Sequence, residues 1–125
     1  MNIHVQIIPH NKQRYETVGD WFFDGNGTLH IHVSKMSDSR YERLVAIHEI
    51  VEAVLCDEVG INEADVTKFD MAFEDARSMG NTTEPGDMIA APYYRQHQIA
   101  TGIEKMLAAE LEVDWLEYEK EINKL

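Results

Sequence analysis

The sequence has little that could crosslink the chain or anchor it in a membrane. It contains one cysteine, Cys56, which excludes an internal disulfide and a cysteine-rich zinc site. No apolar run reaches the roughly 18 residues needed to cross a bilayer. The first residues show no basic region followed by a long apolar one, so we expect no signal peptide. Together these absences lead us to expect a cytoplasmic protein.

Positive charge is also scarce. The chain has 11 lysine and arginine residues against 23 aspartate and glutamate residues, which gives a formal net charge of −12. A nucleic-acid surface and an anionic membrane surface both require clustered basic side chains, so we expect neither as a partner. The 125 residues, of which 44% are apolar, are enough for one domain, residues 1–125, with its own core.

The first third of the chain has the patterns of β-strands. Segments 3–8, 14–24 and 28–34 alternate between apolar and polar residues or are rich in aromatic and β-branched ones. The sequence DGNG, Asp24 to Gly27, is a strong turn signal and predicts that the second and third strands form a hairpin. We therefore expect a three-stranded, mainly antiparallel sheet.

The remainder of the chain has helical patterns. Ser39 and Glu42 form a capping-box pattern before the first helix, and Asn62 and Asp114 are suited to cap later ones. The predicted helices span about 40–58, 63–79, 92–111 and 115–124. The expected fold class is α+β, with a small sheet followed by three to four helices.

The segment AIHEIVEAVLC, Ala46 to Cys56, places ionisable groups inside an otherwise apolar helix. His48 and Glu52 are one turn apart beside an apolar arc, and ligands at positions i and i+4 converge without backbone strain. The HExxH motif of zinc hydrolases uses this geometry, with the intervening glutamate activating a water molecule. The sequence HEIVE, residues 48–52, has this pattern with glutamate in place of the second histidine.

Two interpretations of HEIVE stay open from the sequence. Imidazole and carboxylate both bind zinc at about 2.0–2.2 Å, and the carboxylate moves the metal preference towards Mn or Fe. Alternatively, His48 and Glu52 form an ion pair worth about 0.2–0.5 kcal/mol on an exposed helix surface. A catalytic zinc site needs a third protein ligand, which the first helix does not supply.

His97 is the best candidate for that third ligand. It flanks the apolar arc of the third predicted helix, much as His48 and Glu52 flank the arc of the first. If the two arcs pack together, the three side chains meet, and Glu104 could orient one of the ligands. The alternative is a half-buried histidine bonded to a neighbour. Other candidates, which we interpret as surface groups, are the pairs His30 and His32, Asp70 and Glu74, and Glu84 and Asp87.

This order of elements resembles the core of zincin metallopeptidases. In that family a small sheet precedes a helix with the H-E-x-x motif, and a further ligand follows on another helix. The resemblance covers residues 14–58 in architecture and implies that His48 is a ligand and Glu49 the general base. Glu52 departs from the family's pattern of a second histidine. The phrases AIHEIVEAVLC, EPGD and APYYRQHQIATGIE also resemble a group of small phage and prophage proteins, which implies no particular activity.

The leading hypothesis is therefore a zincin-like metal-binding domain that acts as a peptidase or other hydrolase. His48, Glu52 and His97 would hold the ion, Glu49 would accept a proton from water, and Tyr94 would donate to the developing oxyanion. The substrate would be a peptide or protein that binds along an edge strand. The alternatives are a non-catalytic interaction module and a magnesium-dependent phosphate-ester hydrolase.

Overall fold

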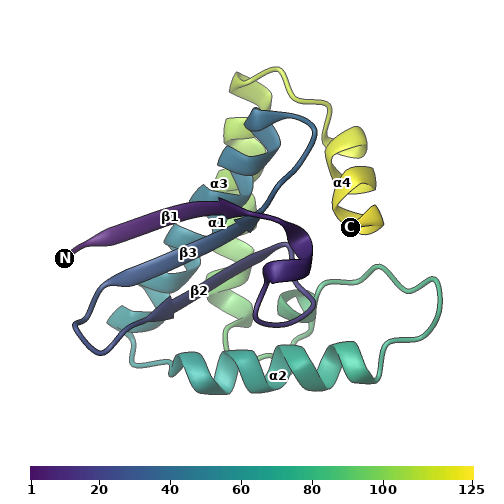
Figure 1. The fold of residues 1–125 in the computed structure, drawn as a ribbon. Coiled ribbons are helices and arrows are strands. Elements are labelled where there is room, and N and C mark those ends of the chain that lie inside the picture. Colours follow the sequence, from purple (N-terminus) through teal and green to yellow (C-terminus); the bar gives the residue numbers. More distant parts are fainter.

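A three-stranded sheet forms one layer of the protein (Figure 1). The computed structural model describes residues 1–125, in which β1 is Ile3–Ile8, β2 is Gly19–Phe23 and β3 is Leu29–Ser34. The strand order is β1-β3-β2. The predicted hairpin of β2 and β3 is confirmed, because these two strands pair antiparallel.

The sheet is mixed, and in this respect the expected mainly antiparallel sheet is wrong. β1 pairs with β3 in parallel, with Ile8 opposite Ser34, and β2 starts near the same end, with Gly19 opposite Val33. The connection between β1 and β2 includes the short 3-10 helix η1, His10–Lys12. This connection crosses the end of β3, so β3, the last strand in the sequence, lies between β1 and β2 in the sheet.

The two faces of the sheet differ in burial. Leu29, Ile31 and Val33 of β3 are fully buried beneath the helices, and strand alternation places His30 and His32 on the opposite face. In β1 the corresponding residues are Ile3, Val5 and Ile7, which remain 41–43% exposed. The sheet therefore contributes to the core mainly through its central strand.

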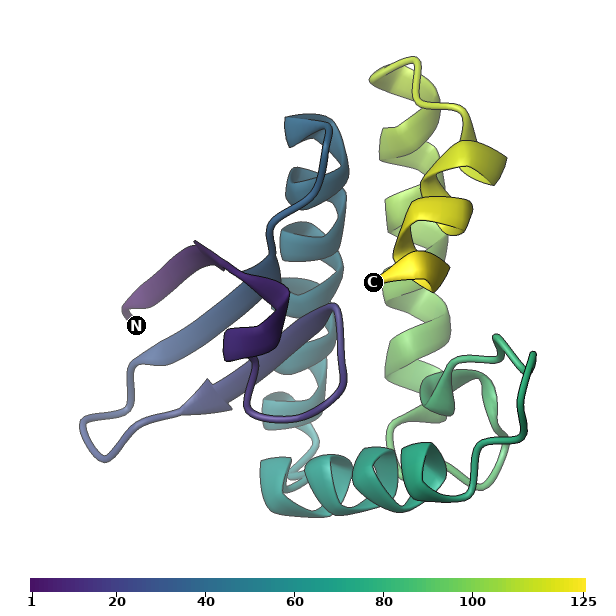
Figure 2. The same ribbon diagram turned by 45° about the vertical axis from the view of Figure 1, so that its right-hand side comes forward.

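Four helices make up the rest of the fold (Figure 2). Their bounds are α1 Ser39–Glu58, α2 Glu63–Asp75, α3 Tyr94–Glu110 and α4 Trp115–Lys124, with a 3-10 turn, η2, at Pro85–Asp87. α1 packs on the sheet, α3 runs antiparallel beside α1, and α2 crosses the end of this pair. No helix is both long enough and apolar enough to cross a bilayer.

Two of the three predicted helix caps are confirmed. Asn62 accepts a hydrogen bond from the backbone of Ala64, and Asp114 caps α4 as predicted. The predicted capping box of Ser39 and Glu42 does not form.

Asp38 is the N-cap of α1 and accepts from the backbone of Arg40. Glu42 instead accepts a hydrogen bond from the backbone of Met36, 2.8 Å away, before the helix begins. The second helix also ends at Asp75, four residues before its predicted end.

The buried face of α1 matches only in part the apolar arc that its sequence indicates, which consists of Leu44, Ile47, Val51, Val54 and Leu55. Leu44, His48, Glu52 and Cys56 are buried in one line along the helix, whereas Val54 of the predicted arc is exposed. The buried line faces the sheet and α3, which contact α1 on two sides. The histidine and glutamate therefore lie within the interface and not at its edge.

The buried face of α3 also differs from its predicted apolar arc. Its buried residues are His97, Ala100, Glu104 and Ala108, spaced at three or four residues, while Ile99 is 40% exposed. Alanine at two of these four positions allows close approach of α3 to its neighbours. Consequently the polar groups of α1 and α3 face each other across the interface between the two helices.

We predict that stability depends on the buried line of α1, to which Leu44 belongs, more than on Val54, an exposed member of the predicted apolar arc. Leu44 is 0% exposed, so Leu44→Ala should lower the free energy of unfolding by about 2–5 kcal/mol through the cavity it leaves. Val54 is 39% exposed, so Val54→Ala should cost less than about 1 kcal/mol. Chemical denaturation measures both values, and equal costs would contradict this assignment of the buried face.

Candidate functional site

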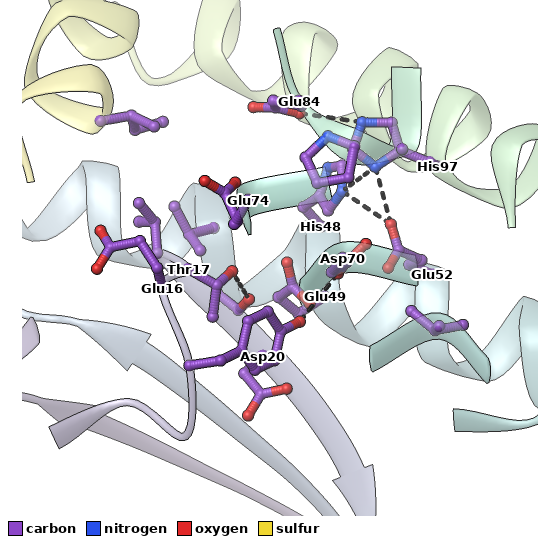
Figure 3. A pocket seen from close by; sticks show the side chains of 18 of the residues that line it. Glu16, Thr17, Asp20, His48, Glu49, Glu52, Asp70, Glu74, Glu84 and His97 are labelled. Carbon is purple, nitrogen blue, oxygen red and sulfur yellow. Dashed lines mark hydrogen bonds and ion pairs between the residues drawn. The ribbon is translucent and has the colours of Figure 1, made fainter. Parts of the chain in front are cut away.

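Three side-chain atoms from α1 and α3 converge on one point (Figure 3). His48 Nε2 lies 3.2 Å from Glu52 Oε2 and 3.2 Å from His97 Nδ1, and the last two atoms are 2.9 Å apart. All three side chains are buried. The structure thus brings together the three residues that the sequence indicates as metal ligands.

The outward-facing atoms of His48 and Glu52, the two cluster residues on α1, contact side chains of other elements. His48 Nδ1 lies 2.7 Å from Glu104 Oε1 on α3, and Glu104 Oε2 accepts a hydrogen bond of 2.5 Å from the Tyr118 hydroxyl on α4. Glu52 Oε1 accepts a hydrogen bond of 3.0 Å from Trp21 Nε1 on β2. Because each bond fixes a side-chain orientation, the inward-facing atoms of His48 and Glu52 are held towards the same point.

His97 is held by the loop that precedes α3. Its Nε2 lies 3.0 Å from Glu84 Oε2 and 3.3 Å from Asp87 Oδ1. Gly86, between them, packs flat on the imidazole, since a Cβ built there would lie 2.4 Å from His97 Cγ. The loop therefore reaches the site, while Glu84 and Asp87 remain exposed surface carboxylates, as the sequence indicates.

Charge pairing governs the protonation of this cluster in the ion-free chain. Burial alone lowers the pKa of His48, but its bonds to Glu104 and Glu52 outweigh burial and leave the pKa well above its usual value. Burial raises the pKa of Glu52, and the two histidines lower it further than that, to about 2. Without an ion the cluster therefore consists of cationic histidines around a carboxylate.

Glu49 lies beside this cluster and not on the polar side of the helix. Its side chain is half-buried and lines the same cavity. A Cβ at Gly19 of β2 would lie 2.6 Å from Glu49 Oε1, so this glycine gives the carboxylate its room against the strand. Burial, and next the charge of Glu52, raise the pKa of Glu49 well above its usual value.

The cluster opens into a cavity of about 320 Å³. The edge strand β2 and the loop before it form one wall, and α2, the loop 81–86 and α4 form the others. Carboxylates dominate the lining, which contains Glu16, Asp20, Glu49, Glu52, Asp70, Glu74, Glu84 and Glu104. Arg77, the one lysine or arginine in the lining, is paired with Glu74. Acidic side chains therefore outnumber basic ones in the lining.

A second buried group of the wall is Asp70 on α2. Its two oxygens accept hydrogen bonds from the hydroxyls of Tyr15, at 2.9 Å, and Tyr93. Tyr93 precedes His97 by four residues and therefore shares its face of α3. Tyr94 lies about 100° further round and does not line the cavity, so the structure lends no support to the predicted oxyanion role of Tyr94.

The remaining candidates lie apart from the cluster. His30 and His32 are on the outer face of the sheet, where Phe22 stacks on His30 at 5.1 Å between ring centroids. Burial raises the pKa of the Cys56 thiol to about 12, and Cys56 is not among the converging groups.

Sequence reasoning missed three residues that complete the site. Trp21, Tyr118 and Gly86 contact Glu52, Glu104 and His97 respectively. The tryptophan and tyrosine have polar atoms that require hydrogen-bond partners when buried, so the sequence alone could have indicated that each makes such a bond. Which residues they bind depends on the tertiary fold and cannot be identified from the spacing of residues in the sequence.

Comparison with known proteins adds no relative to this description. No family model, curated protein or solved structure matches the chain.

We predict a pH-dependent contribution of Asp70 to stability. Burial, opposed by the hydrogen bonds from Tyr93 and Tyr15, raises its pKa to about 7 in the folded chain, against about 3.9 when unfolded. Between these values the folded chain holds a proton that the unfolded chain has lost. This contribution to the free energy of unfolding therefore decreases as the pH rises from about 4 to 7.

Asp70→Asn removes this proton equilibrium. With a chelator present, the unfolding free energy of the variant relative to the parent should rise by more than about 1 kcal/mol between pH 4 and 7, because a tenfold difference in proton affinity is worth about 1.4 kcal/mol. Urea denaturation at several pH values gives this difference. A difference that does not change with pH would show that Asp70 has an ordinary pKa.

Proposed function

We propose that this chain is a zincin-like metal-binding domain that acts as a peptidase or related hydrolase. His48, Glu52 and His97 would hold the ion, which we take to be zinc, with Mn or Fe as alternatives. The observation that supports this proposal is the convergence of three donor atoms from two helices on one buried point.

The distances suit a small divalent ion. Bonds of about 2.0–2.1 Å place neighbouring donor atoms of a tetrahedron about 3.3 Å apart. The three measured separations are 2.9, 3.2 and 3.2 Å. Two histidines and one carboxylate are also a ligand set of known zinc hydrolases, and the fourth position would face the cavity.

The outer contacts of the histidines support the same conclusion. Both nitrogens of His48 face a carboxylate, which only accepts hydrogen bonds, and the shorter contact, 2.7 Å from Nδ1 to Glu104 against 3.2 Å from Nε2 to Glu52, favours Nδ1 for the proton of a neutral His48. Its Nε2 lone pair then points at the oxygen of Glu52 and at His97. With both histidines neutral, such converging lone pairs would repel each other, and the repulsion is relieved either by protons, as in the ion-free chain, or by a metal ion between them. Bonds from ligand histidines to carboxylates are usual in metal sites.

Glu49 is suited to move a proton in this cavity. A bound ion would lower the pKa of water and polarise a substrate carbonyl. The carboxylate of Glu49 lines the cavity beside His48, and burial raises its pKa above the usual value, which makes it a stronger base than an exposed glutamate. A nearby cation would lower that pKa again, towards a value suited to a general base.

The position of β2 supports a peptide substrate. β2 is an edge strand, and Gly19, Asp20 and Trp21 of this strand line the cavity beside Glu49. An extended peptide could add to the open edge by backbone hydrogen bonds and place one of its carbonyls over the cluster.

One observation favours a non-catalytic module as the second candidate. The buried groups also pair with one another in the ion-free chain, and Glu52, with a pKa of about 2, is fully charged between the two histidines. A phosphate-ester hydrolase is less well supported, because Arg77 is paired with Glu74 and the lining offers no other lysine or arginine for a phosphate.

We predict that the protein binds one tight zinc ion per chain. Protein purified without an affinity tag should contain about one zinc by elemental analysis, and His48→Ala should lose tight binding because one of three ligands is removed. His32→Ala is the matched control, since this histidine lies on the outer face of the sheet, and it should retain the ion. Absence of zinc binding in the parent protein would favour the non-catalytic module.

We also predict that Glu49→Gln separates binding from hydrolysis. The variant should retain zinc but lose peptide hydrolysis by about 100-fold or more, because the amide cannot accept the proton. Mass spectrometry of a mixed peptide library detects new cleavage products, and Glu110→Gln, at the exposed end of α3, is the control. A Glu49→Gln variant as active as the parent would refute the assigned base.

A further inference from the structure

The ring of His97 faces a different set of metal-ligand groups with each of its two nitrogens. Nδ1 points at Glu52 and His48, as described above. Nε2 points away from them, at Glu84 Oε2, 3.0 Å distant, and at Asp87 Oδ1, 3.3 Å distant. Figure 3 shows Glu84 and Glu52 on opposite sides of the ring. These contacts define an outer cluster, which consists of Glu84, Asp87 and His97 Nε2.

The outer cluster contains a buried nitrogen whose partners are two carboxylates at ion-pair distance. The side chain of His97 is 7% exposed, and its Nε2 has no aligned hydrogen bond even though two carboxylates lie within ion-pair distance. The carboxylates themselves are 50% and 43% exposed, so an ion can approach them from solvent. A buried imidazole nitrogen aimed between two accessible carboxylates offers a divalent cation one nitrogen and two oxygen ligands when the ring proton is on Nδ1.

The loop is built to present these two carboxylates together. The turn η2 places Glu84 just before Pro85 and places Asp87 at its end. Gly86 packs against the imidazole ring, which leaves no room for a side chain at that position. Gln98 of α3 donates a hydrogen bond of 2.9 Å to Asp87 Oδ1 and so fixes that oxygen.

We propose that Glu84, Asp87 and His97 Nε2 form a second, outer site for a divalent cation that competes with the inner site for His97. A neutral imidazole has one lone pair for a metal, because its other nitrogen carries the proton. An ion on Nε2 leaves the proton on Nδ1, where Glu52 accepts it at 2.9 Å. An ion on Nδ1 leaves the proton facing Glu84 and Asp87. The outer site stands by itself, whereas the competition rests on the proposed inner site.

One nitrogen and two carboxylate oxygens suit Zn, Mn or Fe(II) in preference to a soft ion such as Cu(I). The inner site has two nitrogen ligands and is buried, so it should bind zinc more tightly and hide the outer site in the parent protein. Removal of the inner ligands should therefore reveal the outer site.

Zinc titration of chelator-treated variants, followed by calorimetry, tests this prediction. The double variant His48→Ala/Glu52→Gln should bind one ion, more weakly than the parent. Adding Glu84→Gln/Asp87→Asn to it should abolish that binding, and so should His97→Ala. Glu84→Gln/Asp87→Asn alone should keep one ion in the inner site with affinity about 10–100-fold lower, because the outer contacts of a ligand histidine are changed.

Each result that departs from these expectations identifies the part of the proposal that is wrong. No zinc in His48→Ala/Glu52→Gln would overturn the outer site, and so would zinc that persists after the outer carboxylates are also replaced. Two ions that both depend on His97 in the parent would overturn the competition. If Glu84→Gln/Asp87→Asn binds none while His48→Ala/Glu52→Gln binds one, the proposed inner site fails and the outer one survives.

Nitrogen NMR gives a second measurement if the double variant folds poorly by circular dichroism. In Glu52→Gln alone, added zinc should shift His97 Nε2, whereas in the parent it should shift Nδ1. Coordination through Nδ1 in both proteins would contradict the outer site.

Discussion

The structure depends on four ionisable side chains buried between α1 and α3. His48, Glu52, His97 and Glu104 are among the most buried polar residues of the chain, and burial of such groups is costly unless each one is paired. They satisfy one another across the two helices, and Tyr118 and Trp21 bind the outermost oxygens. This requirement fixes the relative position of α1, α3, α4 and β2, and thereby creates both the cluster and the cavity beside it.

The acidic lining of the cavity follows from the same arrangement. Once the cluster occupies the interface, neighbouring acids such as Glu49 and Asp70 lose solvent and their pKa values rise. A cation at the cluster would relieve this accumulation of negative charge, whereas a phosphate would increase it. The electrostatics therefore support the proposed metal ion and a neutral or positively charged substrate.

The sequence predicted the elements better than their contacts. Periodicity and the cap residues Asn62 and Asp114 located the helices, and DGNG located the hairpin, because these signals are local. Spacing also indicated His48 and Glu52 as a pair, and HEIVE with a distant His97 proved sufficient to anticipate their proximity. The parallel pairing of β1 and the buried faces of α1 and α3 were not predictable, because both result from tertiary packing, which buried the polar line together with only part of the apolar arc.

The central claim is that the point where His48, Glu52 and His97 converge holds a metal ion. Anomalous diffraction at the zinc absorption edge, from crystals grown with zinc, tests this most directly. The account predicts one peak about 2.0–2.2 Å from His48 Nε2, Glu52 Oε2 and His97 Nδ1. Crystals in which these three atoms contact only one another, with no anomalous peak between them, would contradict it.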